Sequence, residues 1–405
     1  DQVIAAGPVA ELSPKRLTPG DDETAVLDAF AQSPISADEK MLWQIGLLDR
    51  ANSGSTLVLV LHHIISDAWS AEILVRDLLD AYQRDLLGAD PLPMLTQDFP
   101  DYALWVAGAK KERALALDYW RSNVAAAPLL TTLPGDYSRP PVKSFVGARA
   151  SRRLKDALSR RIQRRARELR TTPFQIILTA LVTHVAELTN QSKLVIGTVS
   201  AGRSRPYMDQ VIGFFANILP LYLDLPLGQS SAERIALIQA ALFKATAHDL
   251  ISLQEIVADL GLQPDPSANP LFEICVTHDD RRGLTQISAE LGFEFSEVIL
   301  PTTQFDLSFY VIETGHNITL DVTFSTAIYK GARIETLLDD VLVMLEQICD
   351  NTDAPANHIS KAEAAYSIQN TVEPCVTIAT PQMQEPTAKQ KRLWFVDRFE
   401  NGVLY

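Results

Sequence analysis

The chain has 405 residues, of which 47% are hydrophobic and 21% are charged. This composition excludes disordered and fibrous proteins, and the length predicts two or three folding units of roughly 100–200 residues each. The 36 basic and 50 acidic residues give a net charge of −14. Since no strong local basic patch offsets that charge, we expect binding neither to nucleic acid nor to an anionic membrane surface.

Cysteine usage indicates a reducing compartment. Cys275, Cys349 and Cys375 are too few for a disulfide framework in so long a chain, and they show no CxxC spacing. No apolar run approaches the roughly 18 residues of a membrane span, and no signal peptide opens the chain. We therefore expect a cytoplasmic protein. Because Asp1 is not a methionine, we also expect the sequence to be a fragment.

The first predicted elements are a strand and a helix. Residues 56–61 are apolar and rich in β-formers, which predicts a strand buried on both faces. A helix follows, with Ser66 or Asp67 placed to cap it. Residues 87–100 are proline-rich and predict an irregular crossing segment. The aromatic residues between 102 and 120 lie on a second predicted helix.

Prolines and glycines between residues 126 and 141 predict a loop and a boundary between two lobes. Strands alternating with helices beyond this loop indicate α/β units. The expected helices span 151–169, 173–188 and 334–349, and the expected strands span 193–200, 272–277, 305–313 and 318–324.

The segment from His62 to Asp67 is the densest cluster of reactive side chains. It lies where a predicted strand ends and a helix begins, a frequent place for active sites in α/β folds. Consecutive strand residues point to opposite faces, so only one of His62 and His63 is expected to face a substrate. For that reason, and because no third ligand lies at zinc-like spacing, we expect no metal site. Taken alone, the cluster is as consistent with a pair of ordinary strand-end histidines followed by a helix-capping aspartate as it is with an active site.

Further motifs occur in a fixed order along the chain. Residues 62–70 match HHxxxDGxS, with Ala68 at the glycine. The later matches are 99–105 (Y-x-D-[FY]-A-x-W), 119–120 (Y-W), 196–203 (I-G-x-P-x-A-G-R), 212–217 (I-G-x-F-V-N), 267–272 (S-x-x-P-L-F) and 305–308 (F-D-L-[ST]). By these collinear motifs the sequence resembles the condensation domains of nonribosomal peptide synthetases, and it is identified as a member of that family.

The resemblance implies an α/β fold of two lobes like chloramphenicol acetyltransferase, arranged in a V with a central tunnel. Residues 1–125 then form a partial first lobe that carries the histidine motif, and 126–350 form the second lobe. We interpret 351–385 as a linker. The tail at 386–405 resembles the opening motif of the same family, so we favour a fragment that runs into a following domain over a permuted domain. We expect the first lobe to lack a strand or two.

The resemblance also implies amide-bond formation between a donor thioester and the amine of an acceptor. Both substrates arrive on phosphopantetheine arms of upstream and downstream carrier domains, beside an adenylation domain, and the domain itself binds no cofactor. By position, His63 is the catalytic histidine. Because an α-amine is partly neutral at pH 7, we expect His63 to align the amine more than to act as a base. The supporting residues at the site are His62, Asp67, Ala68, Trp69, Arg203, Gly213, Asn217 and Tyr222.

Three departures from the family pattern bear on catalytic competence. Ala68 replaces a glycine, which costs about 1 kcal/mol if the position needs a positive φ. Tyr222 stands where the family has an arginine that pairs with the motif's aspartate, so Asp67 needs other donors, namely helix-start N–H groups or Arg203. The H-Q-x-x-P-F-E segment is barely recognisable at 248–255.

Two other functions remain open at this point. One is a catalytically silent module that docks carriers or recruits a partner, and the other is an ester-forming relative. A cyclising relative is disfavoured because it replaces both histidines with aspartate, whereas this chain keeps His62 and His63.

Overall fold

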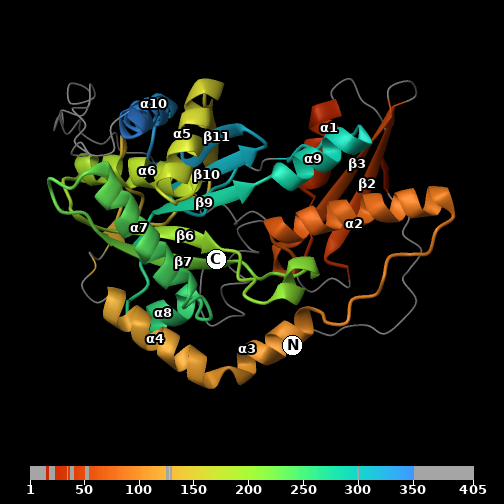
Figure 1. Cartoon of the computed structure of the whole chain (residues 1–405), viewed down its shortest axis with the longest axis horizontal. Helices are drawn as coiled ribbons and strands as arrows, with labels where there is room; N and C mark the ends of the chain where they lie inside the picture. The colour runs from red at the N-terminus through yellow and green to blue at the C-terminus, as the bar shows by residue number, and fades with distance from the viewer. Residues whose placement is uncertain are drawn as a thin grey trace, which may run out of the picture.

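Two β-sheets of different size mark two lobes, as Figure 1 shows. The computed structural model describes residues 15–17, 23–33, 35–36, 41–50, 54–124, 127, 130–298 and 301–350. Within these residues the first-lobe sheet has the strand order β1-β2-β3, and the second-lobe sheet has the order β5-β11-β10-β9-β6-β7. The predicted α/β class is confirmed.

The first lobe is built from a short run of elements. They are β1 (Lys15–Leu17), α1 (Glu23–Ala31), β2 (Trp43–Arg50), β3 (Gly54–Leu61) and α2 (Ala68–Leu87). The apolar β3 segment pairs antiparallel with β2, and β1 runs parallel to β2. Asp67 caps the start of α2, and Gly88, in the left-handed conformation with φ of 63°, ends it. The predicted strand and helix on either side of the histidines are therefore confirmed. The prediction that the strand is buried on both faces was wrong: Val58 is buried but Leu57 is 42% exposed, and β3 lies at the edge of the described first-lobe sheet.

Two consecutive helices lead from the first lobe to the second (Figure 1). They are α3 (Phe99–Gly108) and α4 (Lys110–Val124), where the sequence suggested one helix. Trp120 of α4 is completely buried in the second-lobe core, and its indole N–H donates to the carbonyl of His248 at 2.9 Å. Residues that precede the predicted boundary at 126 thus pack on the second lobe, and the boundary itself stays a prediction.

The second lobe contains the largest hydrophobic core. Its elements are β4 (Leu130–Thr131), β5 (Gly147–Arg153), α5 (Asp156–Glu168), α6 (Pro173–Thr189), β6 (Lys193–Ser200), β7 (Asn217–Asp224), α7 (Ser231–Thr246), α8 (Leu253–Asp259), β8 (Leu271–Phe272), β9 (Ile274–Asp280), α9 (Arg282–Leu291), β10 (Leu307–Thr314), β11 (Asn317–Ser325) and α10 (Gly331–Asp350). A capping box between Thr172 and Gln175 begins α6, with Pro173 in its first turn. Helices α5, α7 and α10 pack against this helix, whose central residues 176–185 are all buried.

One predicted helix was wrong at its start. Residues 151–153 continue strand β5, which pairs antiparallel with β11, and α5 begins only at Asp156. Ala150 faces the core while Arg149 and Ser151 do not, so the local alternation is that of a strand. Residues 151–153 are a strand because they pair with β11, about 170 positions later. The helical periodicity of the residues after Asp156 carries no information about this distant pairing.

The crossing helix α9 connects the lobes at a second place. It is inserted between β9 and β10 of the second lobe and packs against α2 of the first (Figure 1). In the part of the chain that the structure describes, no helix is long and apolar enough to cross a membrane. The predicted linker (351–385) and the predicted opening motif at 386–405 lie outside the described residues.

Candidate functional site

His62 stabilises the turn between β3 and α2. Its backbone N–H donates to the carbonyl of Leu42 at 2.8 Å, as in a continuing strand. Its Nδ1 accepts from the backbone N–H of Ile64 at 3.1 Å and so caps a short 3₁₀ turn. Because this nitrogen accepts a hydrogen bond, it carries no proton. These contacts support the structural role expected for the first histidine.

His63 is held in the opposite tautomer. Its Nδ1 lies 2.6 Å from the carbonyl oxygen of Ser66, and a carbonyl oxygen only accepts, so Nδ1 must carry the proton. In the neutral ring the lone pair is then on Nε2. The ring is solvent-exposed and packs against Phe214, with ring centroids 4.8 Å apart. His63 therefore presents an oriented acceptor outside the protein core.

Asp67 is buried and fully hydrogen-bonded. Its Oδ1 accepts from the backbone N–H of Ser70 at 2.8 Å and from Arg203 at 3.1 Å. Its Oδ2 accepts from the backbone N–H groups of Phe215 at 3.0 Å and Ala216 at 3.2 Å. The two kinds of donor expected from the sequence, the helix start and Arg203, are both confirmed.

We call this group of contacts the interlobe lock, because it joins the start of α2 in the first lobe to the β6–β7 connection of the second. Its members are Asp67, Ser70, Arg203, Gly213, Phe215 and Ala216. Ser70 exchanges two hydrogen bonds with Gly213, donating to its carbonyl at 2.7 Å and accepting from its N–H at 3.0 Å. The lock thus fixes the residues just after His63 relative to the second lobe.

Arg203 is the cation of the interlobe lock. The side chains of Arg203 and Asp67 are 2% and 4% exposed. Arg203 also donates to the carbonyls of Met208 and Val211, and its guanidinium lies 4.2 Å from the ring centroid of Phe215. Burial lowers the pKa of Arg203, and the charge of Asp67 opposes that shift. A pair this buried is costly to break.

Two glycines in the lock region have no room for a side chain. Gly202 adopts φ of +66°, and a Cβ there would lie 2.0 Å from the carbonyl oxygen of Phe215. A Cβ at Gly213 would lie 2.2 Å from the ring of Phe99. Close backbone approach therefore explains why the sequence has glycine at these two positions.

Ala68 is the first residue of α2 and is exposed. Its φ is not positive, since the described non-glycine residues with positive φ are Arg170, Asn190 and Leu271. The methyl group of Ala68 therefore causes no backbone strain here. Trp69 is 47% exposed, and its indole N–H donates to the carbonyl of Asp209 at 3.3 Å across the lobes. Both residues lie at the site, as expected.

Asn217 and Tyr222 lie further along β7. The side-chain amide of Asn217 donates to the carbonyls of Asp249 and Ile251, at 2.8 Å each, and thereby fixes the segment at 248–255. Tyr222 pairs with Val195 and packs against the second-lobe core. The donors to Asp67 described above do not include Tyr222, so Tyr222 is not a supporting residue of the interlobe lock, and Arg203 provides the cation.

Some residues of the site were not singled out from the sequence. Ser70 is the last letter of HHxxxDGxS, and Phe214 fills the open position of I-G-x-F-V-N, so the motifs contained both. A small apolar cluster also supports the lock from α3. It is formed by Met208, Val211 and Phe215, with Phe99, Tyr102, Trp105 and Tyr207 packed against it.

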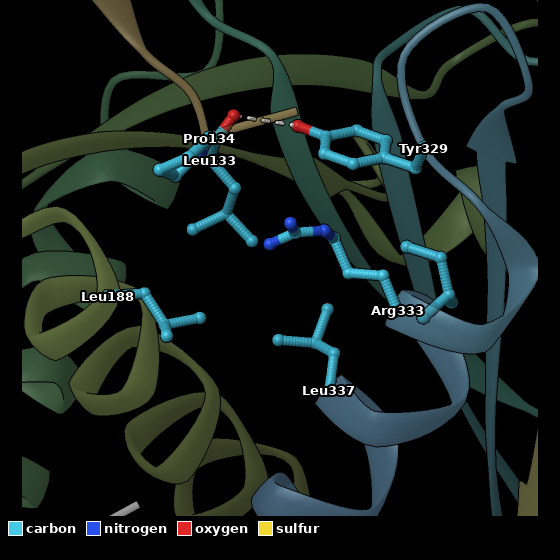
Figure 2. A pocket seen from close by; sticks show the side chains of 7 residues that line it. Leu133, Pro134, Leu188, Tyr329, Arg333 and Leu337 are labelled. Atoms are coloured by element: carbon cyan, nitrogen blue, oxygen red, sulfur yellow. Dashed lines mark hydrogen bonds between the residues drawn. The ribbon is translucent and has the colours of Figure 1, made fainter. Parts of the chain in front are cut away.

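A separate small cavity lies within the second lobe (Figure 2). It is lined by Leu133, Pro134, Leu188, Tyr329, Arg333, Ile334 and Leu337. The Tyr329 hydroxyl donates to the carbonyl of Leu133 at 3.0 Å, and Arg333 pairs with Asp136 at 2.9 Å. These contacts indicate a packing void in the core.

Among the described residues, no three His, Cys, Asp or Glu side chains are placed to hold a metal.

Comparison with protein families agrees with this geometry. The family profile of the condensation domain matches residues 9–366. Surfactin synthase subunit 1 of Bacillus subtilis (strain 168) is 28% identical over 358 residues, which cover 86% of this chain and 10% of that protein. Tyrocidine synthase 3 of Brevibacillus parabrevis is 29% identical over 338 residues, covering 83% of this chain and 5% of that protein. The chain therefore spans a tenth or less of these two relatives.

Solved structures show the same fold. A four-domain nonribosomal peptide synthetase, holo-AB3403 bound to AMP and glycine, matches with a TM-score of 0.74 and 20% identity over 85% of this chain and 28% of that chain. The X-domain from teicoplanin biosynthesis also matches with a TM-score of 0.74, at 21% identity over 88% of this chain and 82% of that chain. The predicted fold is thus confirmed.

Proposed function

Because the chain belongs to the condensation-domain family, we propose that it forms an amide bond between a donor acyl thioester and the amine of an acceptor aminoacyl thioester. The two substrates are delivered on phosphopantetheine arms by an upstream donor and a downstream acceptor carrier domain, in a synthetase that also contains an adenylation domain. The proposal draws on the histidine motif, on the similarity to peptide synthases such as surfactin synthase and tyrocidine synthase, and on the geometry of His63.

The observation that carries the proposal is the hydrogen bond from His63 Nδ1 to the Ser66 carbonyl. It leaves Nε2 as an acceptor on an exposed ring. In the proposed step Nε2 accepts a hydrogen bond from the acceptor amine, which orients the nitrogen lone pair towards the donor carbonyl carbon. The C–N bond forms, the C–S bond breaks, and the proton passes by way of His63 to the departing thiolate.

The interlobe lock supplies the rigidity that such alignment needs. Asp67 follows His63 by four residues, and its carboxylate is held by four donors from both lobes. Fixing Asp67 fixes the turn that carries His63 and Ser66. In this proposal Asp67 and Arg203 are positioning residues, and His62 stabilises the turn.

The experiment compares the two histidines in the full chain with loaded donor and acceptor carrier domains. His63→Ala is expected to lower amide formation by about 10²–10⁴-fold while carrier binding persists, because positioning and proton transfer are both lost. His62→Ala is expected to lower the thermal midpoint instead, since it removes the acceptor for Ile64 N–H. Product is measured by mass spectrometry of the acceptor carrier.

The alternative, a silent module of the same fold, gives a different result. If the parent chain binds both carriers but forms no product, and His63→Ala behaves identically, the catalytic proposal is wrong. An ester product from a hydroxy-acceptor, with none from an amine, would identify the ester-forming relative.

A further inference from the structure

Asp249 lies between α7 and α8, outside the interlobe lock, yet it is bonded to both ends of the β6–β7 connection that contributes to the lock. Ser200 Oγ donates to Asp249 Oδ2 at 2.7 Å. Ser200 Oγ in turn accepts from the backbone N–H of Gly202 at 3.2 Å. At the other end of the connection, the side-chain amide of Asn217 donates to the Asp249 carbonyl at 2.8 Å.

These bonds form two arms that meet at Asp67. On one arm, Gly202 is followed by Arg203, which donates to Asp67 Oδ1. On the other, Asn217 is preceded by Ala216, whose N–H donates to Asp67 Oδ2. The two arms therefore connect Asp249 in the second lobe to Asp67 in the first. Because Gly202 is in close contact with Phe215, neither arm can shift far without moving the other.

We propose that Asp249 is a positioning residue for His63: its carboxylate orients Ser200 and the Gly202 turn so that Arg203 reaches Asp67 four residues after the histidine. This inference rests on the proposed function and adds a residue outside the histidine motif. Asp249 touches no reacting atom in this scheme and acts through Arg203 and Asp67.

The family motifs do not specify the Ser200–Asp249 pair. The pattern I-G-x-P-x-A-G-R leaves position 200 open, and H-Q-x-x-P-F-E, aligned at His248, has glutamine at position 249. Burial raises the pKa of Asp249, and the hydrogen bond from Ser200 opposes that shift. The ionised carboxylate of Asp249 is therefore costly to bury. A group that costs stability where it stands is better explained by a role in positioning than by a role in stabilising the fold.

The test uses Asp249→Ala, Asp249→Asn and Ser200→Ala in the full chain. For Asp249→Ala we expect transfer to fall roughly 10- to 100-fold with unchanged carrier binding, because a small displacement of His63 is enough to lose alignment. Asp249→Asn keeps an acceptor for the serine hydroxyl and should restore most of the rate. Ser200→Ala removes this bond and also the acceptor of the Gly202 N–H, so its loss should be at least as large. Adding Asp249→Ala to Ser200→Ala should cause no further loss, because the Asp249 carboxylate acts through the Ser200 hydroxyl.

A spectroscopic readout separates this inference from the proposed function. Nitrogen-15 NMR of the parent should show protected Arg203 guanidinium protons and a His63 ring protonated at Nδ1, and Asp249→Ala should weaken both signatures. The matched control is Asp265→Ala, which removes another serine–aspartate bond of 2.7 Å at the surface and should change neither. A parent without transfer activity, whose NMR signals still respond to Asp249→Ala, would contradict only the proposed function. Unchanged signals and transfer in Asp249→Ala, or additive losses in the double variant, would overturn the inference.

Discussion

At the scale of single residues, the buried pair of Arg203 and Asp67 governs the site. Removal of one partner leaves the other charge buried without its counter-ion, which typically costs about 3–5 kcal/mol. We expect Asp67→Ala to lose a free energy of unfolding in that range, measured from urea midpoints. The exposed pair of Asp80 and Arg84 provides the control, since Asp80→Ala should cost no more than about 1 kcal/mol. Equal small losses in both variants would show that Asp67 is structurally idle.

Ala68 gives a second prediction at this scale. Since it begins α2 without a positive φ, glycine offers it no relief from strain and adds backbone entropy to the unfolded chain. Ala68→Gly should therefore lower the free energy of unfolding by about 0.5–1 kcal/mol and leave the transfer rate unchanged. A gain in stability or in rate, measured by thermal unfolding and by the carrier assay, would mean that the motif's glycine is needed here after all.

At the scale of elements, the connection from β6 to β7 is the most constrained segment near the site. Gly202→Ala would place a methyl group 2.0 Å from the backbone carbonyl oxygen of Phe215 at a left-handed φ, and neither backbone can yield cheaply. We expect a loss of roughly 1–3 kcal/mol of stability together with a loss of transfer, because Arg203 is displaced.

The control for that prediction is Gly228→Ala. This glycine also has a positive φ, +81°, but a Cβ there meets nothing within 4 Å. Its stability cost should be limited to the backbone term of about 1 kcal/mol, and its transfer rate should match the parent. Comparable effects of the two variants on the transfer rate would refute the idea that crowding at Gly202 controls the site.

At the scale of the whole molecule, we expect the contact between α3 and the β6–β7 connection to weaken at alkaline pH. The ring of Tyr102 lies 4.7 Å from that of Phe215. Burial, and secondarily the charge of Asp249, raise the pKa of Tyr102 from 10.0 to about 12. Because the folded pKa exceeds the unfolded one, stability from the neutral phenol is complete below pH 10 and is lost as pH rises towards 12.

Tyr102→Phe should therefore reduce the loss of stability between pH 10 and 12. The measurement is the urea midpoint at successive pH values, compared with the parent. Tyr82→Phe is the control, because Tyr82 is 61% exposed on α2 and its removal should leave the slope unchanged. An identical pH slope in parent and Tyr102→Phe would show that the phenol does not couple to folding.

Local patterns in the sequence were sufficient for the strand–turn–helix that carries His62, His63 and Asp67. The apolar run before the motif, the capping carboxylate and the helical spacing after it all act within a few residues of one another. The same holds for α6, where a proline and a capping box define the start. The collinear motifs identified the family, and with it the two-lobed fold.

Tertiary structure alone decided how that motif is held. Arg203 and Asp67 are separated by 136 positions, so Arg203 was suggested by its place in a motif, and only the fold brings the two side chains into contact. The tautomer of His63 depends on where the Ser66 carbonyl points, and strand β5 depends on pairing with the distant β11. Buried charges and sheet edges obtain their partners from whatever the folded chain brings nearby. The sequence therefore suggested Arg203 and the helix start as donors to Asp67, whereas only the fold showed that the N–H groups of Phe215 and Ala216 complete the set.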